Sequence, residues 1–396
     1  MNYVFVSPHF PHTYWQFCDR LHQNGINVLG IGDAPYDSLE APLKAALTEY
    51  YRVDSLEDYD QVYRAVAFFA FKYGKIDWVE SMNEYWLEQD ARLRTDFNIT
   101  TGIRSDRISF IKEKSLMKKL YLDAGIPTAR QHVVSGREAG RAFIREVGYP
   151  VIVKPDVGVG AADTWKLEND EDLADFFNKK PDVPYVMEEF VFGNIYSYDA
   201  ICDSKGEPLF ENSCWFPPSV ADMVNKGLEL RYYSLAKVPE QLQDYGRRAL
   251  KAFKVRSRFV HFEFFRLTQA RKNLGEVGEF VGLEVNMRPA GGYTPDMMDF
   301  GHSTDVYQIY ADMVTSDERL LPDLGEDKYC VYAATKDIHQ HAHSRQDILD
   351  KYGERIVMAE RMPDVLSGAM GNEMYTAIVD SEAEVNEFAD YVQEKA

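Results

Sequence analysis

Three polar side chains alternate along an apolar run between residues 280 and 292. Glu284, Asn286 and Arg288 stand two residues apart in the segment FVGLEVNMRPAGG. Successive side chains of a strand point to opposite faces, so we expect these three on one face of a strand. Carboxylate and amide oxygens suit a hard divalent cation, and a guanidinium group suits an anion. The pattern therefore predicts a place where a cation and an anion meet.

A second apolar run, residues 259–265, carries another acid, Glu263. The polar, glycine-containing stretch 269–278 between the two runs is typical of a hairpin connection. Pairing of the two strands would bring Glu263 and Glu284 together, and two buried carboxylates are costly unless a divalent ion with oxygen ligands offsets their charge. We therefore predict a metal–phosphate site, in which Arg288 holds the anionic group that the metal also contacts.

Two lysines upstream carry a similar signal. Lys114 lies in a predicted helix over residues 106–125, and Lys154 ends a predicted strand just before a loop that contains Gly158 and Gly160. A cation beside backbone amides freed by glycines can hold phosphate oxygens. Taken alone, each lysine is more simply explained as a solvated surface residue.

A pair of acids, Glu188 and Glu189, ends the apolar run 185–191. One carboxylate of such a pair can accept from an adenine amino group while the neighbouring backbone pairs with the ring. As an isolated pair, the two acids are more simply explained as solvated.

The order of these features resembles the ATP-grasp superfamily of carboxylate–amine ligases over roughly residues 105–320. The features are a helix lysine, a strand–Lys–Pro–glycine loop, a strand ending in Glu-Glu, an acidic strand, and Glu-x-Asn-x-Arg. Within that superfamily, the first 100 residues and the phrase Tyr196–Asp199 look most like L-amino-acid ligases and carnosine synthases. Purine-pathway relatives share the length, so that alternative stays open.

The resemblance implies roles for the residues that would surround the phosphates. Lys114 would contact a nucleotide phosphate, and Lys154 would bridge the adenine and the α-phosphate. The loop with Gly158 and Gly160 would cover the phosphates. Arg288 would steady the transferred phosphoryl group and the acyl phosphate, which makes it the predicted catalytic residue.

The resemblance also implies an adenine site. Glu188 would lie near the adenine amino group, and the backbone of Glu189 and Val191 would hold the ring. Where many relatives have an acid for a ribose hydroxyl, this chain has Asn194-Ile195. The ribose contact is therefore unassigned, with Asp199 as one candidate.

The implied metal ligands are Glu263, Glu284 and Asn286, which would bind Mg²⁺, with Mn²⁺ as an alternative ion. The implied reaction uses ATP to join a carboxylate to an amine, with amino acids as the expected substrates, through an acyl phosphate, and releases ADP and phosphate. Two other functions stay open: a purine or carbamoyl-phosphate type of ligase, and a nucleotide-binding protein without turnover.

The expected fold is α/β, and α+β in the ATP-grasp part. Residues 1–105 alternate strands and helices and predict a small Rossmann-like βαβ domain, without the glycine fingerprint of a dinucleotide site. We expect a lid subdomain with its preceding helix over 106–190 and a second ATP-grasp subdomain with the Mg-ATP site over 191–325. Both should have mixed or antiparallel sheets, and a small α+β extension should follow over 326–396.

Composition limits the partners. The chain has 396 residues, 45% hydrophobic and 27% charged, with a net charge of −20, which argues against nucleic acid or an anionic membrane as the main partner. No apolar run reaches the ~18 residues of a membrane span, no signal peptide is apparent, and the four cysteines show no CxxC spacing. We expect a cytoplasmic homodimer that acts on small molecules.

His339, His341 and His343 alternate in sequence. Alternate histidines can share a strand face, which zinc would accept. No cysteine or carboxylate partner stands out nearby in the sequence, so a solvated or subunit-facing strand is the favoured interpretation, and the role of the three histidines is unassigned.

Overall fold

The computed structural model describes residues 1–158, 163–217, 228–322 and 324–396, so the predicted loop residue Gly160 lies outside the described residues. Within these ranges the strands form three sheets, two of four strands and one of nine. One small sheet is parallel, and the other two sheets are antiparallel. The predicted α/β class, with α+β character beyond the first domain, is confirmed.

The N-terminal sheet has the order β3-β2-β1-β4 and is parallel throughout. Its strands are β1 (Asn2–Val6), β2 (Asn27–Gly32), β3 (Glu49–Arg52) and β4 (Trp78–Glu80). Its helices are α1 (Trp15–Gln23), α2 (Ala41–Ala46), α3 (Tyr59–Tyr73) and α4 (Leu87–Asp96). All five residues of β1 are buried, as expected for a parallel strand that is covered on both faces. The predicted βαβ arrangement is confirmed.

The helix predicted over residues 106–125 is wrong as a single element. The chain forms α5 (Ser109–Lys112) and α6 (Lys114–Asp123), separated by Glu113, whose backbone is extended (φ −88°, ψ 112°). The break makes Lys114 the first residue of α6, where its backbone N–H donates to the Asp156 carbonyl at 3.0 Å. The start of α6 is thereby attached to the strand that carries Lys154.

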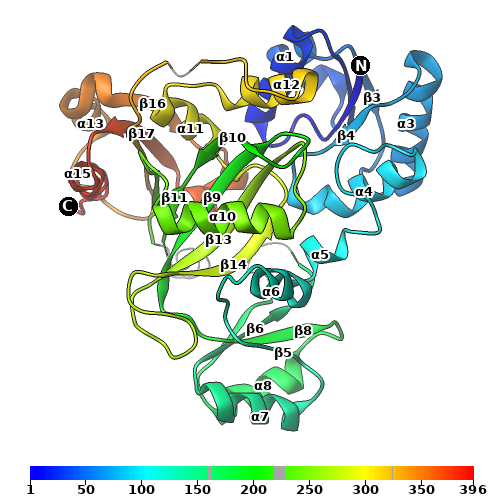
Figure 1. The fold of residues 1–396 in the computed structure, drawn as a ribbon. Coiled ribbons are helices and arrows are strands. Elements are labelled where there is room, and N and C mark those ends of the chain that lie inside the picture. Colours follow the sequence, from blue (N-terminus) through cyan, green and yellow to red (C-terminus); the bar gives the residue numbers. More distant parts are fainter. Residues whose placement is uncertain (159–162, 218–227, 323) are drawn as a thin grey trace.

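The second four-stranded sheet has the order β5-β8-β6-β7. Its strands are β5 (Gln131–Val133), β6 (Val151–Pro155), β7 (Trp165–Leu167) and β8 (Tyr185–Glu189), with helices α7 (Arg137–Val147) and α8 (Asp170–Lys179). Phe143, Ile144 and Phe176 bury the inner faces of the helices against the strands. This part forms the narrow lower lobe in Figure 1, with both helices at its tip.

The large sheet has the order β14-β13-β9-β11-β12-β15-β17-β16, and β10 pairs with β9. Its first strands are β9 (Gly193–Cys202), β10 (Pro208–Asn212), β11 (Cys214–Phe216), β12 (Arg231–Ser234), β13 (Arg258–Leu267) and β14 (Phe280–Asn286). The remaining strands are β15 (Tyr329–Thr335), β16 (Ile356–Arg361) and β17 (Glu373–Val379). Its helices are α10 (Glu240–Ala252), α11 (Thr294–His302), α12 (Val306–Ser316), α13 (Arg345–Tyr352), α14 (Asp364–Met370) and α15 (Glu382–Val392). Strands β15–β17 continue this sheet without a break, and the boundaries of the four domains stay predictions.

A buried ion cluster connects the N-terminal domain to the large sheet. Glu80, at the end of β4, lies 2.7 Å from Arg94 and also pairs with Arg258 of β13. All three side chains are at most 3% exposed. Arg258 donates to the Met287 carbonyl at 2.7 Å, so the cluster holds the N-terminal domain against the segment that follows β14.

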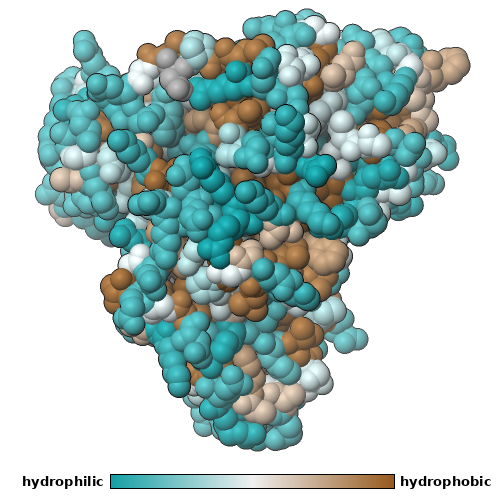
Figure 2. All heavy atoms as spheres, viewed as in Figure 1, coloured by the Kyte–Doolittle hydropathy of each residue, from teal (hydrophilic) through white to brown (hydrophobic). Residues whose placement is uncertain are grey.

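The surface in Figure 2 is mostly hydrophilic, with hydrophobic residues in scattered patches. All four cysteines are free and buried. Among the described residues, no helix has the length and apolar character needed to cross a membrane.

Candidate active site

The two predicted acidic strands pair as expected. Strands β13 and β14 are antiparallel neighbours, with Glu263 opposite Glu284 and His261 opposite Asn286, and a bulge follows Glu263. Side chains at directly opposed positions have Cβ atoms about 5 Å apart. Asn286 is buried at 6% exposure, and the Glu284 side chain keeps 26% of its surface. The hairpin therefore brings two carboxylates and an amide together, as predicted.

Lys114 and Lys154 add positive charge beside these acids. The Lys114 Nζ lies 3.5 Å from Glu284 Oε1 and donates to the Gly158 carbonyl at 3.3 Å. The Lys154 Nζ lies 3.0 Å from Glu188 Oε2. Burial alone would lower the pKa of Lys154, but the charges of Glu188 and Glu284 outweigh burial, and the pKa is raised. Neither lysine is a solvated surface residue.

Glu188 lies at the centre of this charge network. It is 4% exposed, which rules out the solvated interpretation of the acid pair. Burial alone would raise the pKa of Glu188, but the ammonium groups of Lys118 and Lys154 hold it down to about 2. The carboxylate is therefore charged and pairs with the ammonium groups of Lys118 and Lys154.

Lys118 belongs to the site although the sequence analysis did not select it. Its Nζ lies 3.5 Å from Glu188 Oε1 and donates to the Gly282 carbonyl at 3.4 Å, and its side chain is 2% exposed. Lys118 stands four residues after Lys114. That spacing places both residues on one helix face, which is the sequence signal for this second lysine.

Arg288 reaches across to the N-terminal domain. Its Nε lies 3.8 Å from Glu84 Oε2, in the short helix η3 (Glu84–Trp86), and Glu84 also binds Lys112 at 2.8 Å. The charge of Arg288 is one of those that lower the pKa of Glu263. The guanidinium group thus lies between the acidic hairpin and the N-terminal domain. Glu84 carries no sequence motif that would have selected it.

His261 is a second residue that the sequence analysis missed. It is 5% exposed, its Nδ1 lies 2.6 Å from Asp199 Oδ1, and its Nε2 lies 3.2 Å from Glu263 Oε1. Burial would lower the pKa of His261, but Asp199 and Glu263 raise it to about 9. The imidazolium therefore orients one predicted metal ligand. His261 stands two residues before Glu263 and therefore lies on the same strand face, which is the sequence signal that could have selected it.

Asp199 does not fit the ribose contact considered from the sequence. It is fully buried and accepts hydrogen bonds from Ser197 Oγ at 2.7 Å and Asn212 Nδ2 at 3.1 Å, besides its contact with His261. No surface of this carboxylate is left for a nucleotide hydroxyl. The structure disfavours this candidate because His261, Ser197 and Asn212 enclose the carboxylate.

Glu189 and Val191 lie at the edge of the lower lobe. The Glu189 carboxylate binds Arg130 Nη2 at 2.7 Å, away from Lys154, and Val191 packs against Leu267 and Val281. Both side chains are thus used for packing and pairing, and the role predicted for their backbone stays a prediction. The Gly158 carbonyl accepts a hydrogen bond from Lys114, whereas Gly160 is outside the described residues, and the phosphate loop stays a prediction.

The donor set fits magnesium. Glu263, Glu284 and Asn286 offer only carboxylate and amide oxygens, the ligands that hard divalent cations prefer. The two facing carboxylates are partly compensated by Lys114 and His261, and a divalent ion would offset the remaining repulsion.

The fold of the chain is similar to that of known proteins. Three solved structures superpose over nearly the whole chain. An L-amino acid ligase from Bacillus licheniformis has a TM-score of 0.71 and 13% identity, covering 99% of this chain and 96% of that one. An N5-carboxyaminoimidazole ribonucleotide synthetase from Thermus thermophilus has 0.69 and 16%, covering 100% and 99%. The biotin carboxylase domain of a 2-oxoglutarate carboxylase from Hydrogenobacter thermophilus, with MgADP, ADP and bicarbonate, has 0.70 and 16%, covering 97% and 87%.

The chain has the ATP-grasp fold. The predicted resemblance is thus confirmed at the level of the fold. No family model matches the sequence. Over 106 residues the sequence is 26% identical to the large chain of a carbamoyl phosphate synthase from Agathobacter rectalis, a match that covers 26% of this chain and 10% of that protein. The chain therefore spans only a small part of that relative's length.

Proposed function

We propose that this ATP-grasp protein is a ligase that uses ATP and Mg²⁺, with Mn²⁺ as an alternative ion, to join a carboxylate to an amine. The observation that carries the proposal is the direct opposition of Glu263 and Glu284, with Lys114 3.5 Å from Glu284. A site that only bound adenine would not need two facing carboxylates at its phosphate end.

The residues divide the work as follows. Lys114 and Lys154 hold phosphate oxygens of ATP, and Arg288 stabilises the charge that develops as the γ-phosphoryl group moves to the substrate carboxylate. Glu263, Glu284 and Asn286 would hold magnesium. When bound, the metal would neutralise charge on the transferring phosphoryl group.

The products follow from this transfer. Breaking the bond to the γ-phosphoryl group releases ADP and leaves an acyl phosphate on the substrate. An amine then attacks the acyl carbon, the amide forms, phosphate leaves, and the amine proton passes to solvent. Gly158, at the start of the predicted covering loop, lies beside Lys114, where closure would keep water from the acyl phosphate. No protein nucleophile is required.

We propose amino acids as the substrates. The likeness to the L-amino acid ligase, over 99% of this chain, supports this choice. A second candidate has bicarbonate as the carboxylate, since the 2-oxoglutarate carboxylase domain, whose structure contains bicarbonate, superposes equally well. A nucleotide-binding protein without turnover is the third.

The test is a matrix of amino acid pairs, bicarbonate and aminoimidazole ribonucleotide, assayed for ADP and phosphate release, with product mass measured. We expect release that depends on an amino acid pair and a product whose mass equals both amino acids minus water. Release with bicarbonate would favour the second candidate. ATP binding without release for any substrate would favour the third.

Glu284→Gln tests the site itself. Loss of one charged ligand should lower kcat by about 10²–10³-fold, the usual size of a lost electrostatic contribution to a transition state. Glu276→Gln, an exposed acid of the same hairpin connection, is the matched control and should leave kcat unchanged. Near-normal ADP release by Glu284→Gln would contradict the assignment.

We also propose a cytoplasmic homodimer. Four free, buried cysteines support a reducing compartment. Light scattering of the purified chain would test the dimer.

A further inference from the structure

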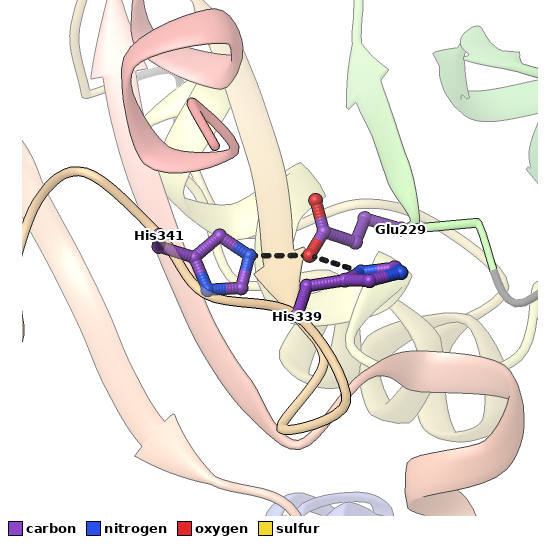
Figure 3. A group of neighbouring side chains, drawn as sticks. All are labelled: Glu229, His339 and His341. Carbon is purple, nitrogen blue, oxygen red and sulfur yellow. Dashed lines mark hydrogen bonds and ion pairs between the residues drawn. The ribbon is translucent and has the colours of Figure 1, made fainter. Parts of the chain in front are cut away.

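Two histidines and a glutamate that take no part in the candidate active site come together in the structure. Glu229 stands two residues before β12, and His339 and His341 follow β15. The predicted histidine strand is wrong, because residues 336–344 form turns and bends with a single bridge at His341. The carboxylate partner that the sequence lacked nearby is supplied by a residue 110 positions from His339. Figure 3 shows both imidazole rings pointing at the Glu229 carboxylate.

The three side chains are arranged like ligands of one ion. Glu229 Oε1 lies 3.1 Å from His339 Nδ1 and is also in contact with His341 Nε2. One ligand atom from each residue lies within 4.8 Å of the others. Donor atoms about 2.05 Å from a tetrahedral zinc ion are about 3.3 Å apart. Movements of about 1–2 Å by the histidine rings would therefore suffice to close the set around an ion.

The surroundings favour a metal site over a chance surface cluster. The Glu229 side chain is 6% exposed, and those of His339 and His341 are 22% and 14% exposed. The three side chains are thus mostly buried, and the two histidines keep some exposed surface. Among His/Cys/Asp/Glu groups in the part of the chain that the structure describes, this is the set of three that meets the distance requirement.

The loop that carries the histidines is held in place on both sides. The His339 N–H donates to the Lys336 carbonyl at 3.0 Å, and the Ala342 N–H donates to the Glu394 carbonyl at 2.8 Å. The Ala396 N–H donates to the Gln340 carbonyl at 3.1 Å. A loop fixed by backbone hydrogen bonds loses little entropy when its side chains bind an ion, which favours affinity.

We propose that Glu229, His339 and His341 bind a divalent transition-metal ion, with Zn²⁺ as the best match. Two imidazoles and one carboxylate suit zinc, whereas magnesium and calcium prefer all-oxygen sites. The bound ion connects the start of β12 to the loop after β15. Three protein ligands leave a fourth position for water or an incoming group. This site is separate from the Glu263–Glu284 pair and does not depend on the proposed ligase activity.

The experiment titrates Zn²⁺ into the full chain, without a histidine tag and with excess Mg²⁺ to occupy the oxygen site. Calorimetry and metal analysis after dialysis give affinity and stoichiometry. We expect one zinc ion per chain. His339→Asn and His341→Asn should each weaken binding by at least about tenfold, since even outer-shell partners of metal ligands are worth 10–100-fold. Glu229→Gln should behave in the same way.

His343→Asn is the matched control. It is in the same loop but pairs with Glu394 at 2.9 Å and stacks on Tyr391, so its zinc affinity should equal that of the unmodified chain. Circular dichroism checks that each variant is folded. If the variants do not fold, the unmodified chain decides the question: zinc should protect His339 and His341, and not His343, from diethyl pyrocarbonate.

Three results would overturn the proposal. The first is the absence of stoichiometric zinc on the unmodified chain. The second is equal affinity in the folded His339→Asn and His341→Asn variants. The third is equal protection of all three histidines, which would place the ion elsewhere.

Discussion

Ionised Glu188 should stabilise the fold at neutral pH, and this contribution to the free energy of unfolding should be lost as the pH falls. Its pKa falls from the ordinary value of 4.5 to about 2 because Lys118 and Lys154 outweigh the effect of burial. A carboxylate with a lowered pKa in the folded state adds stability above its unfolded pKa. That stability is lost as the pH falls through the folded value.

The magnitude follows from the two pKa values. Each pKa unit is worth 1.36 kcal/mol, so a shift from 4.5 to about 2 contributes about 3 kcal/mol at pH 7. At pH 3 the unfolded chain is almost fully protonated at this position while the folded chain is mostly ionised. By linkage, about 2 kcal/mol of the contribution is already lost at that pH.

Urea unfolding at pH 7 and pH 3 measures this contribution when the chain is compared with Glu188→Gln. The variant lacks the titrating group, so the difference in unfolding free energy between the two proteins should shrink by about 2 kcal/mol between pH 7 and pH 3. Glu171→Gln, which changes an exposed acid of α8 in the same lobe, is the control variant. A Glu188→Gln difference that is equal at both pH values would refute the reasoning.

Two further predictions concern other buried charges. Lys118→Met should weaken ATP binding about tenfold, or by about 1.4 kcal/mol, because Lys154 would become the sole cation paired with Glu188. Calorimetry measures the ATP affinity. The control is Lys119→Met, since the Lys119 side chain is 67% exposed. Glu80→Gln should lower the free energy of unfolding by about 3–5 kcal/mol, since it leaves Arg94 and Arg258 buried without their partner. Urea unfolding measures this second effect, and the exposed control Glu88→Gln should change the free energy of unfolding by no more than about 0.5 kcal/mol. An unchanged ATP affinity in Lys118→Met would contradict the first prediction. A Glu80→Gln chain as stable as the original would contradict the second.

The acidic hairpin was predictable because its signal is local and periodic. Side chains that alternate in an apolar run fix the face of a strand, and a polar, glycine-containing connection of about ten residues fixes its partner. The register that places Glu263 opposite Glu284 does not follow from these two facts, because a bulge after Glu263 shifts the pairing by one residue. The parallel first domain was predictable for the same reason, since its strands and helices alternate along the chain.

Features that depend on distant residues were not predictable in this way. The break at Glu113 arises because the Lys114 N–H bonds to the Asp156 carbonyl, a contact across 42 residues. Glu229 contacts His341, which is 112 residues away in the sequence, and no local sequence pattern predicts that contact. Arg288 contacts Glu84 of another domain. In each case the tertiary fold, rather than propensity or spacing, decides the partner.

The charge balance of the site explains why a nucleotide would need a divalent cation there. Lys118 and Lys154 are already paired with Glu188, and Lys114 is paired with Glu284. A triphosphate would therefore share these lysines with their glutamates, and it would approach two facing carboxylates. The negative charges of a triphosphate and of the two carboxylates would repel strongly in a partly buried site. An ion bound by the hairpin oxygens reverses the sign of the field that the phosphates meet. The lysine–glutamate pairs hold these side chains in place without a nucleotide, and under the proposed function a bound metal would assist nucleotide binding.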